Sequence, residues 1–153
     1  MRKILMSLAV VLLVCGCGPK SEADNPQRDL SKLTIGSGKS AVELQVETAV
    51  SDEEMRKGLM FRKKLPIDQG MIFLVTPPKT IAMWMKNTYI PLDMVFVDDE
   101  NKVSGIIEKA QPLSETMLQS PERTKAVIEL SGGAVKKYKI RKGEIVKHPL
   151  LGN

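Results

Sequence analysis

The apolar and polar residues alternate with a period of two from Leu33 onward. In residues 41–49, Val42, Leu44 and Val46 alternate with polar side chains, which is typical of a strand with one buried face. Short and nearly continuous apolar runs come later in the chain, and such runs suit strands that are buried on both faces. Runs of this kind lie at 71–75, 81–85 and 92–97, and further strands are expected at 103–108, 125–130 and 144–147.

The sequence signals one helix clearly and a second one more weakly. Ser51 is placed as an N-cap, and Glu54 three residues later completes a capping box. Gly58 is suited to end this helix in the left-handed conformation. A second short helix is expected over 132–138, with Ser131 as its cap.

About seven strands separated by turns, with one or two short helices, predict a mainly β fold. The expected architecture is a small closed or partly open β-barrel or sandwich. Gly and Pro, including Pro77 and Pro78, are expected to end the apolar runs. No internal repeat is visible, so residues 32–153 are expected to form a single domain.

The N-terminus has the pattern of an export signal. Arg2 and Lys3 precede an apolar run at 4–14, which is too short to span a bilayer. The run ends in Val14-Cys15-Gly16-Cys17, which resembles the lipobox of bacterial lipoprotein precursors. This resemblance implies a diacylglyceryl thioether on Cys17, where several acyl chains together anchor a protein stably. Ordinary secretion with a free Cys17 thiol is the alternative.

These features divide the chain into three parts. Residues 1–16 are expected to be a cleaved lipoprotein signal peptide, and residues 17–31 the lipidated Cys17 with a polar, flexible tether. The domain is then expected to be exported and attached to a membrane, facing the periplasm. Gly18 after the acceptor favours the outer membrane, and a bacterium with one membrane would carry the domain on its surface.

Composition narrows the classes of partner. The full chain has a net charge of +5, and losing Arg2 and Lys3 leaves 21 basic residues against 18 acidic ones, or +3. The densest basic cluster lies at 136–142. A solvated face is the simplest interpretation of this cluster, and contact with anionic lipid is the alternative. Nucleic acid is not expected as a partner, because aromatic residues are not interleaved with the basic ones.

Several kinds of chemistry are excluded by the residues available. His148 is the sole histidine, and Cys17 is the sole cysteine after residue 16. Ser–His and Cys–His nucleophiles, a disulfide within the chain and a zinc site on His and Cys are therefore not expected. The methionines could hold Cu(I), but Met71 and Met94 lie in core-like runs, so we expect no metal and no cofactor.

Three motifs carry a family resemblance. They are GLMFR at 58–62, GMIF at 70–73 and WMKNTYIPLD at 84–93, and the segment VIEL at 127–130 also fits. Together they resemble the domain of unknown function 192 family over about residues 42–147. The resemblance implies a compact, mainly β domain that is often found behind a signal sequence. It implies no biochemical activity.

The polar side chains in and beside these motifs are the candidate ligand-binding residues. Asp93 lies within an apolar run, where an ionised carboxylate is costly unless it is paired. It is interpreted either as a buried structural carboxylate or as the acidic end of a polar cleft. Cations together with amide and hydroxyl groups suit an anionic or carboxylate-bearing ligand. The candidates are Arg56, Arg62, Lys86, Asn87, Thr88 and Asp93.

Three functional hypotheses follow, and the sequence favours binding over catalysis. The first is a non-catalytic envelope module that binds a small anionic ligand or an envelope protein through residues 86–93. The second is a carboxylate-dependent hydrolase of cell-envelope material, with Asp93 as acid or base. The third is a purely structural envelope lipoprotein.

Overall fold

The structure is a computed structural model that describes residues 29–152. Cys17 and the expected leader lie outside the described residues. The strands are β1 (Ser31–Ile35), β2 (Val42–Ala49), β3 (Gln69–Lys79), β4 (Ala82–Met83), β5 (Leu92–Val97), β6 (Val103–Ala110), β7 (Leu118–Gln119), β8 (Thr124–Ser131) and β9 (Val146–Lys147). The helices are α1 (Asp52–Lys57) and α2 (Ala134–Tyr138), with single 3-10 turns at Gly38–Ser40 and Pro149–Leu151.

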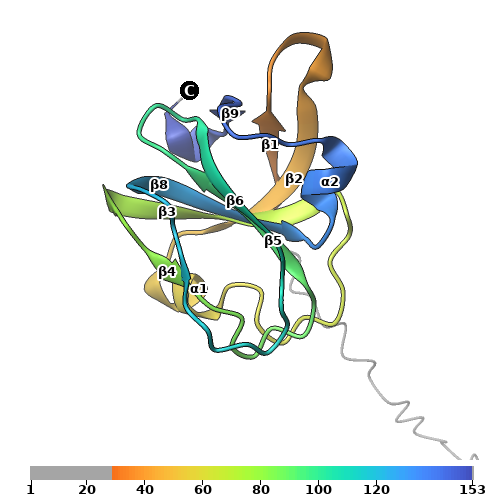
Figure 1. The fold of residues 1–153 in the computed structure, drawn as a ribbon, viewed down its shortest axis with the longest axis vertical. Helices are drawn as coiled ribbons and strands as arrows, with labels where there is room; N and C mark the ends of the chain where they lie inside the picture. The colour runs from red at the N-terminus through yellow and green to blue at the C-terminus, as the bar shows by residue number, and fades with distance from the viewer. Residues whose placement is uncertain (1–28, 153) are drawn as a thin grey trace, which may run out of the picture.

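Seven strands form one sheet in the order β6-β5-β8-β3-β2-β1-β9, and β4 and β7 form a second, two-stranded sheet. Strands β2 and β3 pair in parallel, and the other pairs are antiparallel. The large sheet curves into a half-barrel, with α2 on one side and α1 and β4 at the other end of the molecule (Figure 1). The predicted mainly β fold with short helices is therefore confirmed.

Both faces of the large sheet are covered, which explains why the central strands are apolar without alternation. Successive side chains on a strand point to opposite faces. In β5, Val95 and Val97 belong to one apolar cluster, whereas Met94 and Phe96 belong to the other. The first cluster packs beneath α2, and the second packs beneath the loops that follow α1 and β4.

The first helix begins where the sequence predicts. Glu54 N–H donates to the Ser51 hydroxyl over 3.2 Å, and Ser51 N–H donates to the Glu54 carboxylate over 3.0 Å, so the capping box is present. The helix ends at Gly58, but not in the left-handed conformation. Gly58 has φ 47° and ψ −130°, a region that is open only to glycine.

The second helix is capped differently from the prediction. Ser131 is the last residue of β8, and the N-cap is Gly133, whose φ is 96°. A serine at 131 is too far from the first turn, and the backbone N–H groups there donate to Asp93 of β5 instead. The cap was missed because its side chain is 40 residues away in the sequence.

The prediction that Pro77 and Pro78 end a strand is also wrong. Strand β3 continues through them to Lys79, and its pairing with β8 shifts register between Leu74 and Lys79. Proline lacks the N–H that a regular ladder requires, so the strand becomes irregular there without ending. Of the run at 81–85, only Ala82–Met83 forms a strand, β4. Ala82 and Trp84 are exposed, so the expectation that this run is buried on both faces is wrong.

The first strand begins at Ser31, the last residue of the expected tether. Ser31 is the first residue of β1, and its hydroxyl lies 2.7 Å from His148 Nε2. His148 Nδ1 accepts a hydrogen bond from Leu150 N–H over 3.2 Å, so Nε2 carries the ring proton and donates a hydrogen bond to the Ser31 hydroxyl oxygen. The first strand is thereby joined to the C-terminal segment. Burial lowers the pKa of His148 below its usual value.

Candidate functional site

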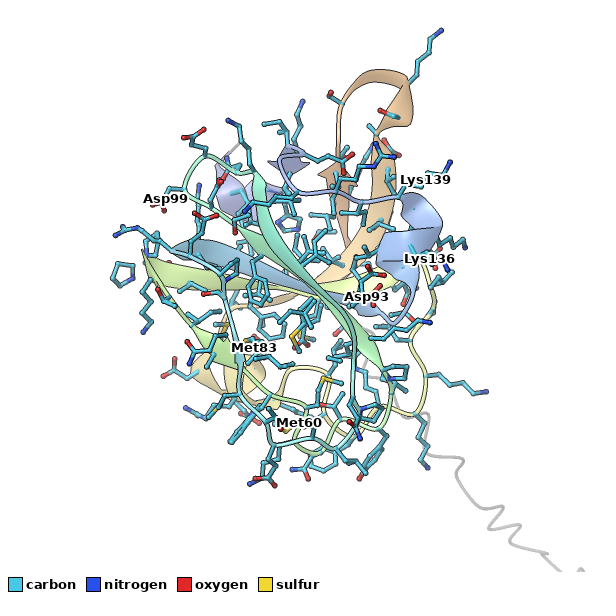
Figure 2. The ribbon with its side chains drawn as sticks, in the orientation of Figure 1. Met60, Met83, Asp93, Asp99, Lys136 and Lys139 are labelled. Atoms are coloured by element: carbon cyan, nitrogen blue, oxygen red, sulfur yellow. The ribbon has the colours of Figure 1, made fainter. Side chains whose placement is uncertain are left out.

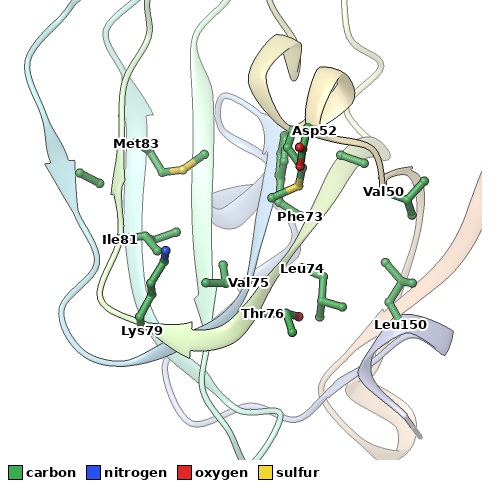
Figure 3. Close-up of a pocket in the computed structure, with 13 residues that line it drawn as sticks. Val50, Asp52, Phe73, Leu74, Val75, Thr76, Lys79, Ile81, Met83 and Leu150 are labelled. Atoms are coloured by element: carbon green, nitrogen blue, oxygen red, sulfur yellow. The ribbon is translucent and has the colours of Figure 1, made fainter.

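A groove lies between α1 and β4, on the face of the sheet opposite α2. It consists of three hollows of about 490, 400 and 40 Å³, each lined in part by Met55 and Met83. The largest hollow runs along β3 toward Leu150, and Figure 3 shows the side chains of Phe73 and Met83 around it. A combined space of this size is typical of sites for small organic ligands.

The smallest hollow ends on the carboxyl group of Glu129. This hollow has room for about one water molecule. Glu129 is 5% exposed and lies on β8, with Met71 of β3 and Met94 of β5 paired beside it. A carboxyl group with thioether-bearing neighbours on both sides is poorly solvated, which disfavours its charged form.

A second carboxylate lies two strands away on the same face. Glu47 of β2 pairs with Met71, so Glu47 and Glu129 flank the same residue of β3. Arg62 reaches Glu47 with two hydrogen bonds of 2.5 and 2.6 Å, a bidentate ion pair with both side chains largely buried. Arg62 is therefore directed mainly at Glu47 and attracts Glu129 more weakly.

The protonation of Glu129 follows from this arrangement. Burial raises the pKa of the Glu129 carboxyl to about 7, and the positive charge of Arg62 opposes that rise only in part. Near neutral pH the group is consequently divided between the charged and the neutral form. In its neutral form it can donate a hydrogen bond into the groove, which a carboxylate cannot do.

Two glycines of the motifs allow the backbone to approach Glu129. A Cβ built on Gly58 would lie 3.2 Å from the Phe73 ring and 3.8 Å from the Glu129 carboxyl oxygen. A Cβ on Gly70 would lie 2.3 Å from the carbonyl oxygen of Glu129, a distance at which the strands could not pair. These contacts explain the glycines of GLMFR and GMIF.

The WMKNT segment builds the rim of the groove through its backbone. Asn87, with φ 55°, accepts a hydrogen bond from Phe61 N–H over 2.8 Å. Thr88 accepts one from Leu113 N–H over 3.0 Å, and Met85 N–H donates to Ser114 O over 2.9 Å. Three loops that are distant in sequence are thus joined beside the groove.

Four of the predicted candidates lie at or near the groove. Arg56 lines two of its hollows, and Thr88, which is buried, lines the smallest. Lys86 lies 5.2 Å from the centre of the Trp84 ring and 3.7 Å from Glu115, so its ammonium group is at the outer edge. The side-chain amide of Asn87 lies 4.0 Å from the sulfur of Met60. Arg62, the fifth, lines none of the three hollows and is held in its pair with Glu47.

The sixth candidate, Asp93, is on the other side of the sheet. Figure 2 shows Asp93 beside α2, while Met60 and Met83 lie toward the opposite end of the molecule. Its carboxylate is fully buried and accepts hydrogen bonds from Lys109, Gly133 and Val135 N–H over 2.8, 2.9 and 2.8 Å. The structure therefore does not bring Asp93 together with Lys86, and Asp93 serves as the cap of α2.

Glu129 and the methionines were not predicted to belong to one site. Glu129 lies between apolar residues in VIEL as Asp93 does in PLDMV, so an acidic residue within an apolar run was a signal for both. The two carboxyl groups lie on opposite faces of the sheet, because successive side chains on a strand point to opposite faces. Asp93 is on the face of Val95, and Glu129 is on the face of Val127.

The groove offers binding contacts and one acid of unusual pKa. Among residues 29–152, no group of three or more His, Cys, Asp or Glu side chains is placed to hold a metal ion. In the same range, none of the helices has the length and apolar character needed to cross a membrane. Most of the lining side chains are apolar. The polar ones are Arg56, Lys57, Thr88 and Glu129 around the smallest hollow, and Asp52, Thr76 and Lys79 around the largest.

Two solved structures resemble this chain closely. One is a protein of unknown function from Novosphingobium aromaticivorans DSM 12444, with 37% identity, a TM-score of 0.75, and coverage of 80% of this chain and 89% of that chain. The other is a protein from Sinorhizobium meliloti 1021, named as a candidate transcription regulator, with 33% identity, a TM-score of 0.75, and coverage of 80% and 96%. No curated protein matches the chain.

The family model for DUF192, described as Uncharacterized ACR, COG1430, matches residues 33–148. This range includes all three motifs and every residue that lines the groove except Leu150. The chain therefore belongs to the DUF192 family.

Proposed function

We propose that this protein is a non-catalytic binding module of the cell envelope that takes a small amphipathic molecule into the groove between α1 and β4. The observation that carries the proposal is the groove itself. Its three hollows share Met55 and Met83, and its apolar walls end at the exposed cation Arg56. An apolar body would occupy the walls, and an anionic group would pair with Arg56.

The burial of the two candidate acids, Glu129 and Asp93, supports binding rather than hydrolysis. A carboxyl with a pKa of about 7 has the property of a general acid. However, Glu129 is 5% exposed, and the space of about 40 Å³ beside it cannot admit a substrate. Asp93, the acid or base of the hydrolase hypothesis, is enclosed by three backbone donors.

The methionine-rich walls could adapt to ligands of different shape. Methionine side chains are unbranched and polarisable, so they can repack around ligands of different outline. Met55 and Met117 are 37% and 57% exposed, and core packing does not account for them. Met71, Met85 and Met94, by contrast, are fully buried and fill the core.

Binding is tested with 1-anilinonaphthalene-8-sulfonate, an apolar aromatic body with one sulfonate. We expect saturable binding, with enhanced fluorescence, to the folded protein. Met83→Glu places a charge in the shared wall and should abolish binding, while Arg56→Gln should weaken it about tenfold. Arg141→Gln, an exposed cation in the turn before β9, is the matched control and should bind as the parent does. Unchanged affinity in Met83→Glu would exclude the groove as the site.

The proposed location rests on the N-terminal sequence alone. We propose a lipid on Cys17 that holds the domain at an envelope membrane, facing the periplasm. Cys17→Ser should release the domain to the soluble extracytoplasmic fraction with an unchanged melting temperature. Retention of Cys17→Ser in the membrane fraction, or the absence of a lipid by mass spectrometry of the parent, would contradict this location.

The name of the Sinorhizobium relative concerns that protein, and we propose no nucleic-acid partner here. In the described part of the chain, α1 has six residues and α2 has five. A recognition helix must be long enough to lie in the major groove and present several side chains to the base edges. Neither of these helices provides that surface.

A further inference from the structure

The loops around the groove expose several large apolar side chains. Eight large apolar side chains are exposed among the described residues, and five of them lie on loops 59–62, 84–90 and 113–117. We call these five the apolar rim: Phe61, Trp84, Tyr89, Leu113 and Met117. Their exposed fractions range from 40% to 58%.

The members of the apolar rim lie on loops that backbone hydrogen bonds join to one another. The rings of Phe61 and Tyr89 are 6.2 Å apart in an edge-to-face arrangement. Trp84 and Met117 line the same hollow, and Leu113 is joined to the WMKNT segment by the hydrogen bond to Thr88. Single apolar residues scattered over a surface need no explanation, but apolar residues gathered on neighbouring loops are typical of an interaction site.

Cations surround the apolar rim. Residues 56–64 contain five basic and no acidic side chains, and Phe61 lies among them. Of these five, Arg62 is paired with Glu47, and the other four, Arg56, Lys57, Lys63 and Lys64, are exposed. Lys86 lies over the Trp84 ring at 5.2 Å, next to a single acidic neighbour, Glu115.

We propose that the apolar rim inserts into the surface of an anionic lipid bilayer, so that the groove opens onto the membrane. Trp and Tyr favour the boundary between headgroups and acyl chains, because each has an apolar body and a polar tip. Lys and Arg beside them extend toward anionic headgroups. This composition fits a bilayer better than a protein interface, where lysine is depleted.

The inference deepens the proposed function and rests on it in one respect. A groove whose mouth lies on a bilayer would receive its ligand from the membrane, so the ligand class becomes amphiphiles that reside in lipid. Trp84 and Met117 belong to both the rim and the groove lining. Phe61 and Leu113 belong to the rim alone, which allows the two ideas to be tested separately.

The experiment uses the fact that Trp84 is the only tryptophan of the chain. The full-length protein is reconstituted with vesicles of phosphatidylglycerol and phosphatidylcholine whose acyl chains are brominated. We expect the Trp84 emission to shift to shorter wavelength and to be quenched by the bromine atoms. Quenching should be weaker on phosphatidylcholine alone, and it should decrease when salt is raised to about 1 M.

One double variant removes two side chains of the rim without disturbing the backbone. Phe61 and Leu113 have φ values of 66° and 61°, a conformation that asparagine tolerates best among non-glycine residues. Phe61→Asn combined with Leu113→Asn should reduce quenching at least fivefold while the melting temperature stays the same. Lys136→Gln combined with Lys137→Gln, two exposed residues of α2, is the control and should leave quenching unchanged. Every variant has the same N-terminus, so attachment there contributes equally.

Other results would contradict the membrane proposal or the ligand proposal. An unquenched parent, or equal quenching in the rim variant, overturns the proposal, even if the apolar rim then proves to bind a protein. Loss of quenching in the α2 control alone assigns membrane contact to the basic cluster instead and also overturns it. Binding of anilinonaphthalene sulfonate should persist in the rim variant. If the parent is quenched but binds no sulfonate, the proposed ligand function fails while the membrane surface stands.

Discussion

The carboxylate of Asp93 accepts a hydrogen bond from Val135 N–H over 2.8 Å, although the two residues are 42 positions apart. The same oxygen accepts a second hydrogen bond from Gly133 N–H, and the other oxygen accepts one from Lys109 N–H. A carboxylate at the start of a helix satisfies N–H groups that have no partner within the helix. Asp93 thus joins β5, β6 and α2 from a fully buried position.

We expect Asp93→Asn to destabilise the protein by about 3 kcal/mol. The amide would place its own N–H₂ group toward backbone donors and would leave at least one of them unsatisfied in the core. Urea unfolding followed by circular dichroism measures the change in the free energy of unfolding. A loss below about 1 kcal/mol would contradict the structural role of Asp93.

Lys86→Ala provides the comparison for Asp93. The Lys86 side chain is 42% exposed and pairs with Glu115 over 3.7 Å. Exposed pairs of this kind contribute little, so the free energy of unfolding should change by less than about 1 kcal/mol. Equal losses in Lys86→Ala and Asp93→Asn would argue against the separate roles assigned to them.

Ser51→Ala should destabilise the protein by about 1 kcal/mol, because it removes one of the two hydrogen bonds of the capping box. Ser37 is the matched control. It precedes the 3-10 turn at Gly38–Ser40 and makes no capping hydrogen bond with its side chain. Ser37→Ala should therefore leave the melting temperature unchanged, and a similar loss in both variants would show that the cap is not responsible.

The raised pKa of Glu129 predicts a dependence of stability on pH. The folded protein holds a proton on Glu129 up to about pH 7, whereas the unfolded chain releases it near 4.5. Between these values the folded state binds more protons, so the free energy of unfolding falls as pH rises. This contribution is complete below pH 4.5, is lost above pH 7, and amounts to roughly 3 kcal/mol.

Glu129→Gln should remove this dependence, because glutamine keeps the shape and does not titrate. Urea unfolding of parent and variant at a series of pH values from 4.5 to 8 makes the comparison. The difference between the two proteins should grow with pH in favour of the variant. A constant difference across that range would mean that Glu129 is ionised throughout.

The lowered pKa of His148 predicts the opposite dependence of the free energy of unfolding on pH. Its pKa is lowered by burial, so below pH 6.5 the unfolded chain binds a proton that the folded protein excludes. The free energy of unfolding should therefore fall as pH decreases below 6.5. His148→Gln should remove that acid-dependent part, even if its lost contact with Ser31 lowers stability at every pH. If the acid slope is the same in parent and variant, another group causes it.

Much of the fold could be predicted from local sequence. The period-two pattern located β2, and the continuous apolar runs located the core of β3, β5 and β8. The helix at Ser51 was predicted correctly because a capping box involves contacts only three residues apart. Such features depend on neighbours in the chain, so local sequence is sufficient to determine them.

Three features depended on partners that are distant in sequence. The cap of α2 comes from Asp93, β1 begins at Ser31 against His148, and β3 continues through Pro77 and Pro78 by a shift of register. The short β7 strand pairs with β4, and no apolar run in the sequence predicts it. None of these pairings leaves a periodic signal in the sequence.

The sequence by itself determined the fold class, the helix at Ser51 and the motif residues around the groove. The tertiary structure decided which buried carboxyl faces that groove. Asp93 and Glu129 both lie in apolar runs. Because side chains alternate between the two faces of the sheet, Asp93 lies beneath α2 and Glu129 lies beneath Gly58. Side chains on one strand alternate between faces, and the pairing of strands decides which faces coincide. A local pattern therefore indicates that a carboxyl is buried, while only the assembled sheet decides what it meets.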